Sequence, residues 1–239
     1  MQLTDEQQRI VKSNDKHMLV VANAGTGKSH TIIERLNYLI NERNVSPSRI
    51  LLTSFSRTAG SELYEKASSK LGSFSASSMV IGTIHSICYK VILQNIELLN
   101  LKKITIVSDS YLTGMVLNRN PSMFEGKKDA TKIVSSFRKY LLQGGTLEIS
   151  SDAFAVVDEC QKILHSEGKY VYDDLMLKTV ELFKQYPHVL DKWKNKFDYI
   201  FTDEAQDTNK IQWDILAYLE NEHTHTCVVG DAKQNIYVS

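Results

Sequence analysis

Short apolar runs alternate with amphipathic stretches along much of the chain. Helical spacing of apolar residues is present over residues 31–42, from Thr58 onward and from Lys210 onward. Parallel strands joined by helices have both faces covered and therefore carry nearly continuous apolar residues. The pattern predicts an α/β fold with a parallel sheet. The apolar runs of strand length are residues 18–21, 50–54, 79–83, 198–203 and 226–230.

The pattern changes between residues 86 and 186, where helical spacing dominates. Amphipathic stretches cover residues 130–142, 151–165 and 172–186. Glycines interrupt the block, and it contains no internal repeat and no low-complexity stretch. We therefore expect a mainly helical insertion into the α/β domain.

A glycine-rich segment lies between the first apolar run and the first amphipathic stretch. Glycines let backbone N–H groups approach phosphate oxygens, and the following helix points its positive dipole end at the anion. Lys28 supplies charge to the outer phosphates, and the Ser29 hydroxyl suits Mg²⁺. We interpret the segment as a phosphate-binding P-loop rather than as a simple glycine-rich turn. In order it is Ala22, Asn23, Ala24, Gly25, Thr26, Gly27, Lys28 and Ser29.

Two acidic residues end the fourth apolar run. Asp203 and Glu204 follow a β-prone segment, and ligands of open parallel sheets bind at the carboxyl ends of strands. We expect Asp203 to hold Mg²⁺ with Ser29, and Glu204 to orient water for attack on a γ-phosphate. On their own the two acids equally fit a solvated turn, and the P-loop favours the functional interpretation.

Composition fits a soluble protein without a global attraction to nucleic acid. The 239 residues contain 28 Lys plus Arg and 28 Asp plus Glu, so any DNA track must be local. The three cysteines lack CxxC spacing, which favours buried, reduced thiols over a zinc site. We find no segment of membrane-spanning length and expect an intracellular, cytoplasmic protein that makes no use of a membrane.

The acidic segment resembles motif II of the UvrD/Rep/PcrA group of superfamily 1 DNA helicases. It reads Asp203-Glu204-Ala205-Gln206-Asp207-Thr208. The other family-like segments occur in the expected order: residues 3–8 resemble the Q motif, 53–59 motif Ia, 82–86 motif Ib, 172–175 a short motif before motif II, and 228–237 motif III. The resemblance implies a RecA-like P-loop NTPase domain that uses ATP and Mg²⁺. It places domain 1A in residues 1–88 and 191–239, ending in motif III, and a 1B-like insertion in residues 89–190.

The resemblance also implies roles for single residues. Gln7 would read the adenine edge, and Gln234 would act in catalysis by sensing the γ-phosphate. His30 stands where relatives usually have an arginine against adenine, and Ala22 stands where the first P-loop glycine is usual. Asp173 and Asp174 either belong to the short family motif or cap a helix.

Single-stranded DNA is the partner that motifs Ia and Ib imply. Phe55 would stack on a base, with a core phenylalanine as the alternative. Thr83, His85 and Ser86 would contact phosphates, with a structural histidine as the alternative for His85. Arg57 departs from the asparagine that is frequent in motif Ia.

Two functions follow from these observations. In the first, the chain is the ATP-binding half of a DNA helicase that moves on single-stranded DNA, and a C-terminal RecA-like domain (2A) with arginine fingers would complete it. We then expect the fragment alone to bind ATP and not to unwind DNA. In the second, the chain is a stand-alone nucleotide-binding switch or interaction module.

Overall fold

The computed structural model describes residues 2–23 and 25–231, which form two compact units. The first unit draws on segments 1–86, 187–208 and 216–239, and the second on segments 87–186 and 209–215. We describe each unit by itself.

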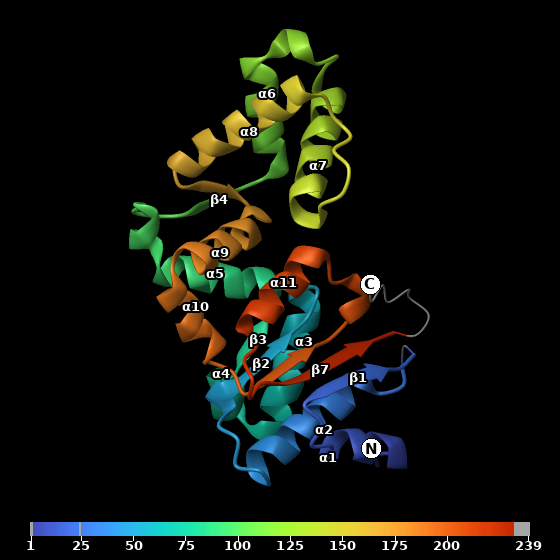
Figure 1. Ribbon diagram of the computed structural model, residues 1–239. Coiled ribbons are helices and arrows are strands. Elements are labelled where there is room, and N and C mark those ends of the chain that lie inside the picture. Colours follow the sequence, from blue (N-terminus) through green and yellow to red (C-terminus); the bar gives the residue numbers. More distant parts are fainter. Residues whose placement is uncertain (1, 24, 232–239) are drawn as a thin grey trace. The chain divides into compact units, whose positions relative to one another are not determined.

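A five-stranded parallel sheet forms the centre of the first unit (Figure 1). The order across the sheet is β1-β7-β6-β2-β3. In the central strand β2 all four residues are buried, as expected for a continuous apolar run covered on both faces. The five predicted strands are therefore confirmed, each to within one residue of its predicted ends. Their bounds are β1 His17–Val21, β2 Ile50–Thr53, β3 Val80–Gly82, β6 Tyr199–Thr202 and β7 His225–Gly230.

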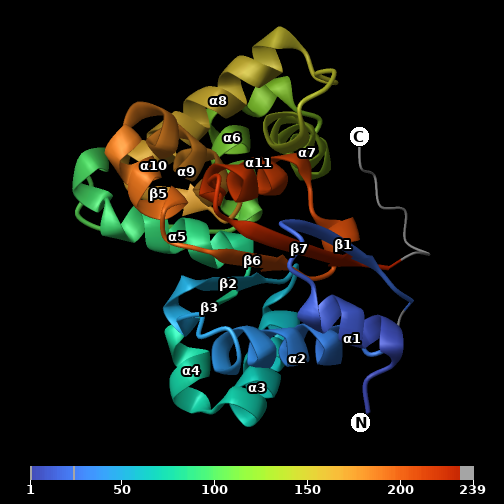
Figure 2. The ribbon, with the colours of Figure 1, turned by 60° about the horizontal axis from the view of Figure 1, so that its bottom comes forward.

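Four helices lie on one face of this sheet, as Figure 2 shows. They are α1 (Asp5–Lys12), α2 (Lys28–Asn41), α3 (Arg57–Leu71) and α4 (Ser73–Ser78). The apolar residues of α2 are spaced so that one stripe faces the strands. The stripe packs on the sheet in a single core, which holds α2, and with it the segment before α2, against the strands. The buried stripe consists of Ile32, Ile33, Leu36 and Leu39.

Arg35 of α2 holds the end of α1. Its Nη1 donates hydrogen bonds to the carbonyl oxygens of Ile10 at 2.7 Å, Val11 at 3.1 Å and Ser13 at 3.0 Å. Carbonyls at a helix end have no partner within their own helix, and here a buried guanidinium supplies one. At the other end, Thr4 forms a reciprocal capping box with Gln7.

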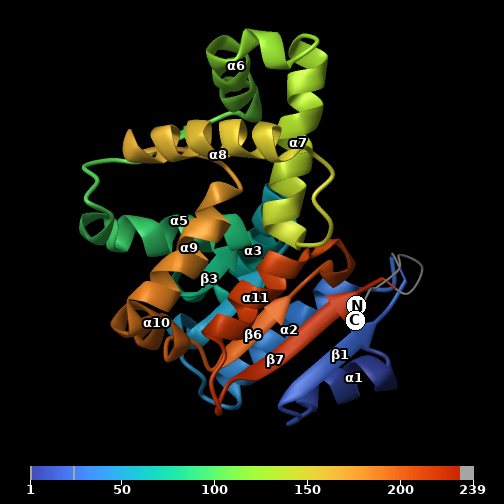
Figure 3. The same cartoon turned by 45° about the horizontal axis from the view of Figure 1, so that its top comes forward.

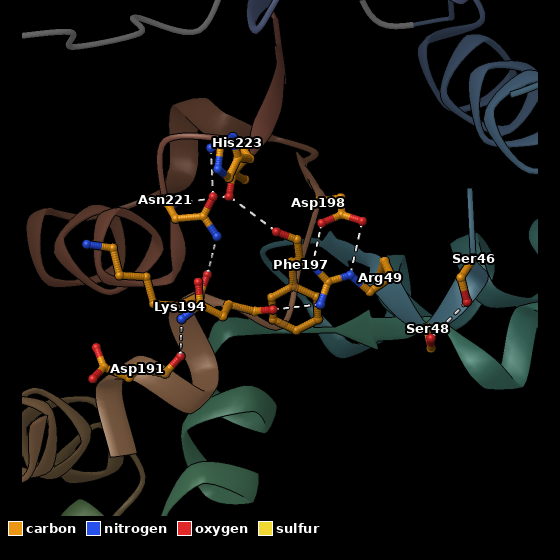
Figure 4. Close-up of polar contacts among 11 residues, drawn as sticks. Ser46, Ser48, Arg49, Asp191, Lys194, Phe197, Asp198, Asn221 and His223 are labelled. Carbon is orange, nitrogen blue, oxygen red and sulfur yellow. Dashed lines mark hydrogen bonds and ion pairs between the residues drawn. The ribbon is translucent and has the colours of Figure 1, made fainter. Parts of the chain in front are cut away.

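The amino ends of β2 and β6 are joined by Arg49, at the end of the 3₁₀ turn η1 (Pro47–Arg49). Figure 4 shows the guanidinium facing both carboxylate oxygens of Asp198. The same side chain donates to the carbonyl of Asn195 at 2.6 Å. Nearby, Asn221 donates to the carbonyl of Lys194 at 2.8 Å. These bonds stabilise the edge of the sheet where its parallel strands begin.

The second unit is mainly helical (Figure 3). It contains α6 (Asp109–Arg119), α7 (Lys127–Gln143) and α8 (Ser151–Ser166), which share an apolar core, and also α9 (Asp174–Gln185). The predicted helices over residues 130–142, 151–165 and 172–186 are confirmed. A parallel pair of short strands, β4 (Thr105–Val107) and β5 (Lys169–Val171), was not predicted. The other elements of the described residues belong to either unit or to both: α5 (Ile84–Gln94), η2 (Ile96–Leu99), η3 (Pro121–Met123), α10 (Pro187–Lys194), η4 (Ala205–Asp207) and α11 (Lys210–Leu219).

Asp174 is fully buried in the second unit. Its carboxylate accepts hydrogen bonds from Arg138 at 2.8 Å, from the His165 ring at 2.9 Å and from the backbone N–H of Val171 at 3.0 Å. Burial raises the pKa of Asp174, but His165 and Arg138 together outweigh it and hold the pKa below its ordinary value. Asp173, at the amino end of α9, makes no side-chain capping bond. The capping alternative for the two acids is therefore wrong.

The three cysteines, Cys88, Cys160 and Cys227, are buried and free. Burial raises the pKa of Cys88 to about 12 and that of Cys227 to about 11. Burial raises the pKa of Cys160 as well, so burial disfavours the reactive thiolate at all three positions. The prediction of buried cysteines is confirmed. Among residues 2–23 and 25–231, no helix is both long and apolar enough to cross a membrane.

Candidate nucleotide site

Three segments meet at the carboxyl edge of the sheet because β7 lies between β1 and β6. The glycine-rich segment follows β1, the two acids follow β6 and Asp231 follows β7. The backbone N–H of Ala22 extends the ladder by donating to the carbonyl of Gly230 at 3.0 Å. Parallel sheets bind ligands at this edge, where the strand order brings distant loops together.

The glycine-rich segment has the backbone that a phosphate cradle needs. Gly25 and Gly27 have positive φ angles of 78° and 87°, which glycine adopts without strain. The Thr26 hydroxyl donates to the carbonyl of Asn23 at 2.7 Å and closes the loop. Gly27 immediately precedes α2, so the amino end of that helix faces the loop.

Lys28, the first residue of α2, forms an ion pair across the site. Its Nζ lies 3.5 Å from Oε2 of Glu204, and its side chain is 9% exposed. A charge this well shielded from water interacts strongly with an anion placed beside it. Lys28 and Glu204, predicted to act on the same phosphate, are therefore brought together by the fold.

Asp203 is buried next to Glu204. Its Oδ1 accepts the backbone N–H of Glu204 at 3.0 Å. Burial and then the charge of Glu204 raise the pKa of Asp203, while Lys28 and Lys66 act in the opposite direction. The negative charge of ionised Asp203 is therefore destabilised in the protein alone, and a bound cation would stabilise that charge. Its carboxylate and the Ser29 hydroxyl are hard oxygen donors of the kind that Mg²⁺ takes together with phosphates and water.

Glu204 has a backbone conformation that is unusual for a residue with a side chain. Its φ of 53° and ψ of 46° are left-handed, which typically costs about 1–3 kcal/mol and persists only where surrounding contacts hold it. The chain then turns through η4, and the Gln206 Nε2 donates to Oε2 of Glu204 at 2.6 Å. Such strain at a cavity wall is typical of functional positions.

Lys28, Ser29 and Glu204 line a cavity of about 1020 Å³ in the first unit, and Asp203 lies next to Glu204 without lining it. Between α2 and α3 its wall carries several charged side chains, and Nε2 of His30 is buried without a hydrogen-bond partner among the described residues. The cavity is large enough for a nucleotide, and its lining is polar where phosphates would lie. The lining residues are Gly25, Gly27, Lys28, Ser29, His30, Ile33, Glu34, Glu65, Lys66, Ser69, Lys70, Glu204 and Asp231.

Gln7 connects α1 to the P-loop. Its Oε1 accepts the backbone N–H of Thr4 at 3.0 Å, and its Nε2 donates to the carbonyl of Thr26 at 3.1 Å. A Cβ at Gly27 would lie 3.1 Å from that nitrogen. Gln7 is therefore beside the candidate site, with an amide that already has one partner on each side.

The residues predicted to contact DNA differ in their surroundings. Phe55 is 52% exposed, which excludes the alternative of a core phenylalanine. Thr83 is buried, and its hydroxyl accepts the backbone N–H of Ser86 at 3.2 Å, while the Ser86 hydroxyl donates to the Thr83 carbonyl at 2.7 Å. These two hydroxyls stabilise the start of α5, and His85 lies between them in sequence. The DNA roles of all four residues stay predictions.

Two residues of the predicted site, Ala24 and Gln234, lie outside the described residues. Sequence analysis missed Gln206 as a neighbour of Glu204, although it belongs to the same family-like segment. It also missed the α3 residues of the cavity wall, of which Lys66 acts on Asp203. Within residues 2–23 and 25–231, no three or more His, Cys, Asp or Glu side chains are grouped so that they could hold a metal ion by themselves.

Comparison with known proteins identifies the family. The UvrD/REP helicase N-terminal domain matches residues 3–238. The chain is 32% identical over 251 residues to the ATP-dependent DNA helicase PcrA of Bacillus subtilis (strain 168), an alignment that covers 98% of this chain and 33% of that protein. It is 30% identical over 247 residues to PcrA of Staphylococcus aureus (strain Mu50), covering 98% of the chain and 34% of the relative.

A third relative is the probable DNA helicase II homolog of Mycoplasma capricolum, 32% identical over 254 residues, with 98% of the chain and 35% of the relative covered. The chain thus spans about a third of the length of the curated relatives it matches. The family match covers residues 3–238, and the fold is a parallel α/β sheet with a P-loop at its carboxyl edge. Both observations support the same family. The chain belongs to the UvrD/REP helicase N-terminal domain family.

Proposed function

We propose that this chain is the ATP-binding part of an ATP-dependent DNA helicase that couples hydrolysis to movement on single-stranded DNA. The observation that carries the proposal is the ion pair between Lys28 and Glu204 at the carboxyl edge of the sheet. It joins a phosphate-binding loop to an acid suited to act on water. The family match and the names of the relatives support the same function.

The nucleotide would lie along the loop that precedes α2. Backbone N–H groups of the segment from Ala22 to Ser29 would surround the phosphates, and Lys28 would bind the outer ones. Ser29 and Asp203 would hold Mg²⁺, which neutralises charge on the phosphates when it is bound. Gln7 and His30 would face the adenine, whose N6 amino group donates and whose N7 accepts, so that edge suits the Gln7 amide.

Glu204 would act on the attacking water. In the protein alone its carboxylate is paired with Lys28, and a γ-phosphate would draw Lys28 away from it. The freed carboxylate accepts a proton from water, the water oxygen bonds to the γ-phosphorus, and the bond to the bridging oxygen breaks with its electron pair going to ADP. Gln234 would sense the γ-phosphate, as the family resemblance implies.

Single-stranded DNA is the proposed partner. Phe55 offers an exposed ring on which a base would stack, an interaction typically worth about 1–3 kcal/mol. Thr83, His85 and Ser86 would lie near the phosphate backbone at the start of α5. A C-terminal RecA-like domain (2A) would supply arginine fingers, which typically raise turnover by about 10³–10⁵. Because the relatives are about three times as long, residues 1–239 alone should bind ATP, hydrolyse it slowly and not unwind duplexes. We propose a cytoplasmic location.

The test is an ATPase and duplex-unwinding assay of residues 1–239, with and without single-stranded DNA. We expect slow turnover that falls further in Glu204→Gln, together with DNA binding that weakens as salt rises. The exposed Glu222→Gln is the control for loss of one negative charge. Turnover that is equal in the wild type and Glu204→Gln would exclude the proposed hydrolytic site. Robust unwinding would exclude the proposal that a second RecA-like domain is needed to unwind DNA.

A further inference from the structure

Gln206 joins the acid after β6 to the end of β7. Its Nε2 donates to Oε2 of Glu204 at 2.6 Å, and its Oε1 accepts the backbone N–H of Asp231 at 3.1 Å. A backbone N–H can only donate, so the amide oxygen must face Asp231 and the amide nitrogen must face Glu204. The amide nitrogen also donates to Oδ2 of Asp207 at 3.3 Å, so these hydrogen bonds together set the orientation of the side chain.

The backbone explains why these groups meet. The left-handed conformation of Glu204 reverses the chain, and the Asp207 N–H donates to the Glu204 carbonyl at 3.1 Å, which closes the turn. Gln206 is thereby directed back along the edge of the sheet. Because β7 pairs with β6 in parallel, Asp231 at the end of β7 lies beside this turn.

Lys28 and Gln206 hold the same oxygen of Glu204. The lysine lies at 3.5 Å and the amide nitrogen at 2.6 Å. A bound phosphate would compete for Lys28, because its charge exceeds that of one carboxylate. Gln206 cannot be drawn away in this manner, since its amide is neutral and is anchored on Asp231.

We propose that Gln206 is a positioning residue: it fixes the Glu204 carboxylate for the attacking water after Lys28 has moved to the phosphate, and it ties that carboxylate to the end of β7. This inference rests on the proposed function. It makes Gln206 a hydrogen-bonded link between the hydrolytic acid and Asp231, which follows β7.

Gln206→Glu tests the hydrogen bond that the Gln206 amide nitrogen donates to Glu204. The variant keeps the size of the side chain and an oxygen for the Asp231 N–H, but it turns a carboxylate oxygen toward Glu204. When the introduced carboxyl gains a proton it can donate again, so acidification should restore the bond. Among the charged residues around this side chain, Glu204 and Asp207 accept from its amide nitrogen and Asp231 donates its backbone N–H to the amide oxygen, while Lys28 and Asp203 lie next to Glu204. Gln206→Leu removes both the hydrogen bond to Glu204 and the one from the Asp231 N–H.

The control is Gln185→Glu, because Gln185 is an exposed glutamine that donates to Glu181 at 3.2 Å far from the P-loop in sequence. Single-turnover ATP cleavage with protein in excess and binding of a non-hydrolysable analogue are measured for residues 1–239 from about pH 6 to pH 8. We expect Gln206→Glu to bind the analogue within about 3-fold of wild type and to cleave ATP at least about 10-fold more slowly at the upper pH. The deficit should shrink as pH falls, and Gln206→Leu should show an equal deficit at every pH.

Cleavage by Gln206→Glu within about 2-fold of wild type, or loss of binding and cleavage together without recovery at low pH, would overturn the positioning role. Failure of the proposed function has a different signature, because the wild type itself would then cleave ATP no faster than Glu204→Gln. In that case the role of Gln206 falls with the function on which it rests.

Discussion

Replacing Arg138 by methionine should destabilise the second unit because it leaves a buried carboxylate without its guanidinium. Asp174 is 0% exposed and Arg138 is 6% exposed, so water cannot take the place of the lost partner. Methionine keeps much of the apolar volume of the arginine stem, which limits the effect to charge and hydrogen bonding. The side chain also reaches Asp109, at 3.2 Å from its Nε, but that carboxylate is mostly exposed.

The magnitude follows from the kind of pair that is broken. Removing one partner of a buried ion pair typically costs about 3–5 kcal/mol, whereas removing both is far less unfavourable. With a urea slope of about 2 kcal/mol per M, the unfolding midpoint of the second unit should fall by about 1.5–2.5 M. Adding Asp174→Asn to Arg138→Met should recover part of that loss, since no uncompensated charge would remain.

The two tryptophans permit a separate measurement for each unit. Trp193 belongs to the first unit and Trp213 to the second. In chains labelled with 5-fluorotryptophan, each should give its own fluorine resonance. A urea titration then compares Trp193 with Trp213, which lies on α11, a helix with residues 210–215 in the second unit and 216–219 in the first. We expect the Trp213 transition to move in Arg138→Met and the Trp193 transition to move less.

Arg119→Met is the matched control, because Arg119 lies 3.6 Å from Glu159 with both side chains largely exposed. An exposed pair of this kind typically contributes about 0–1 kcal/mol. Equal midpoint shifts in Arg138→Met and Arg119→Met would refute the argument that burial makes the Asp174 pair costly to break.

Three further predictions concern the nucleotide site. The raised pKa of Asp203 means that the folded state binds its proton more tightly than the unfolded state, so stability falls as pH rises through that raised pKa. Asp203→Asn should therefore raise the Tm without nucleotide and metal, by about 2–4 °C per 1 kcal/mol relieved, while the exposed Asp191→Asn should not; a lowered Tm would contradict this. Gly27→Ala and Gly72→Ala both place a Cβ at positive φ, which typically costs about 1–3 kcal/mol, but only the Cβ at Gly27 meets Gln7. Both should lower the Tm and only Gly27→Ala should also weaken binding of an ATP analogue, so equal binding by the two variants would refute the contact. Gln7→Ala should reduce the preference for ATP over GTP in competition binding, and an unchanged preference would exclude adenine recognition by this side chain.

The fold of the first unit was predictable because its strands can be recognised from their own apolar residues. Strands such as β2 and β7 are buried on both faces, so they are mostly apolar regardless of register. The pair of β4 and β5 lacks that signal, since each strand has three residues and β4 is largely exposed. Its partners lie 64 positions apart, from Thr105 to Lys169, and only the packing of the helices between them brings the two together.

The candidate site was predictable where one local segment carries the chemistry. The P-loop glycines, Lys28 and the acids after β6 follow from short motifs. Gln206 was not predictable in its role, because that role depends on the left-handed conformation of Glu204 and on Asp231, which is 25 positions away. Asp174 is a similar case, since an acid before an apolar helix looks like a cap until Arg138 and His165 are seen to converge on it.

Calorimetric binding of a non-hydrolysable ATP analogue with Mg²⁺ to wild type and Lys28→Ala tests the central claim most directly. Lys162→Ala is the control, since Lys162 is 75% exposed on α8 of the other unit. Loss of the Lys28 charge should weaken binding at least about tenfold, which corresponds to about 1.4 kcal/mol, and Lys162→Ala should bind as the wild type does. Equal affinities of the wild type and Lys28→Ala would contradict a nucleotide site at the carboxyl edge of this sheet.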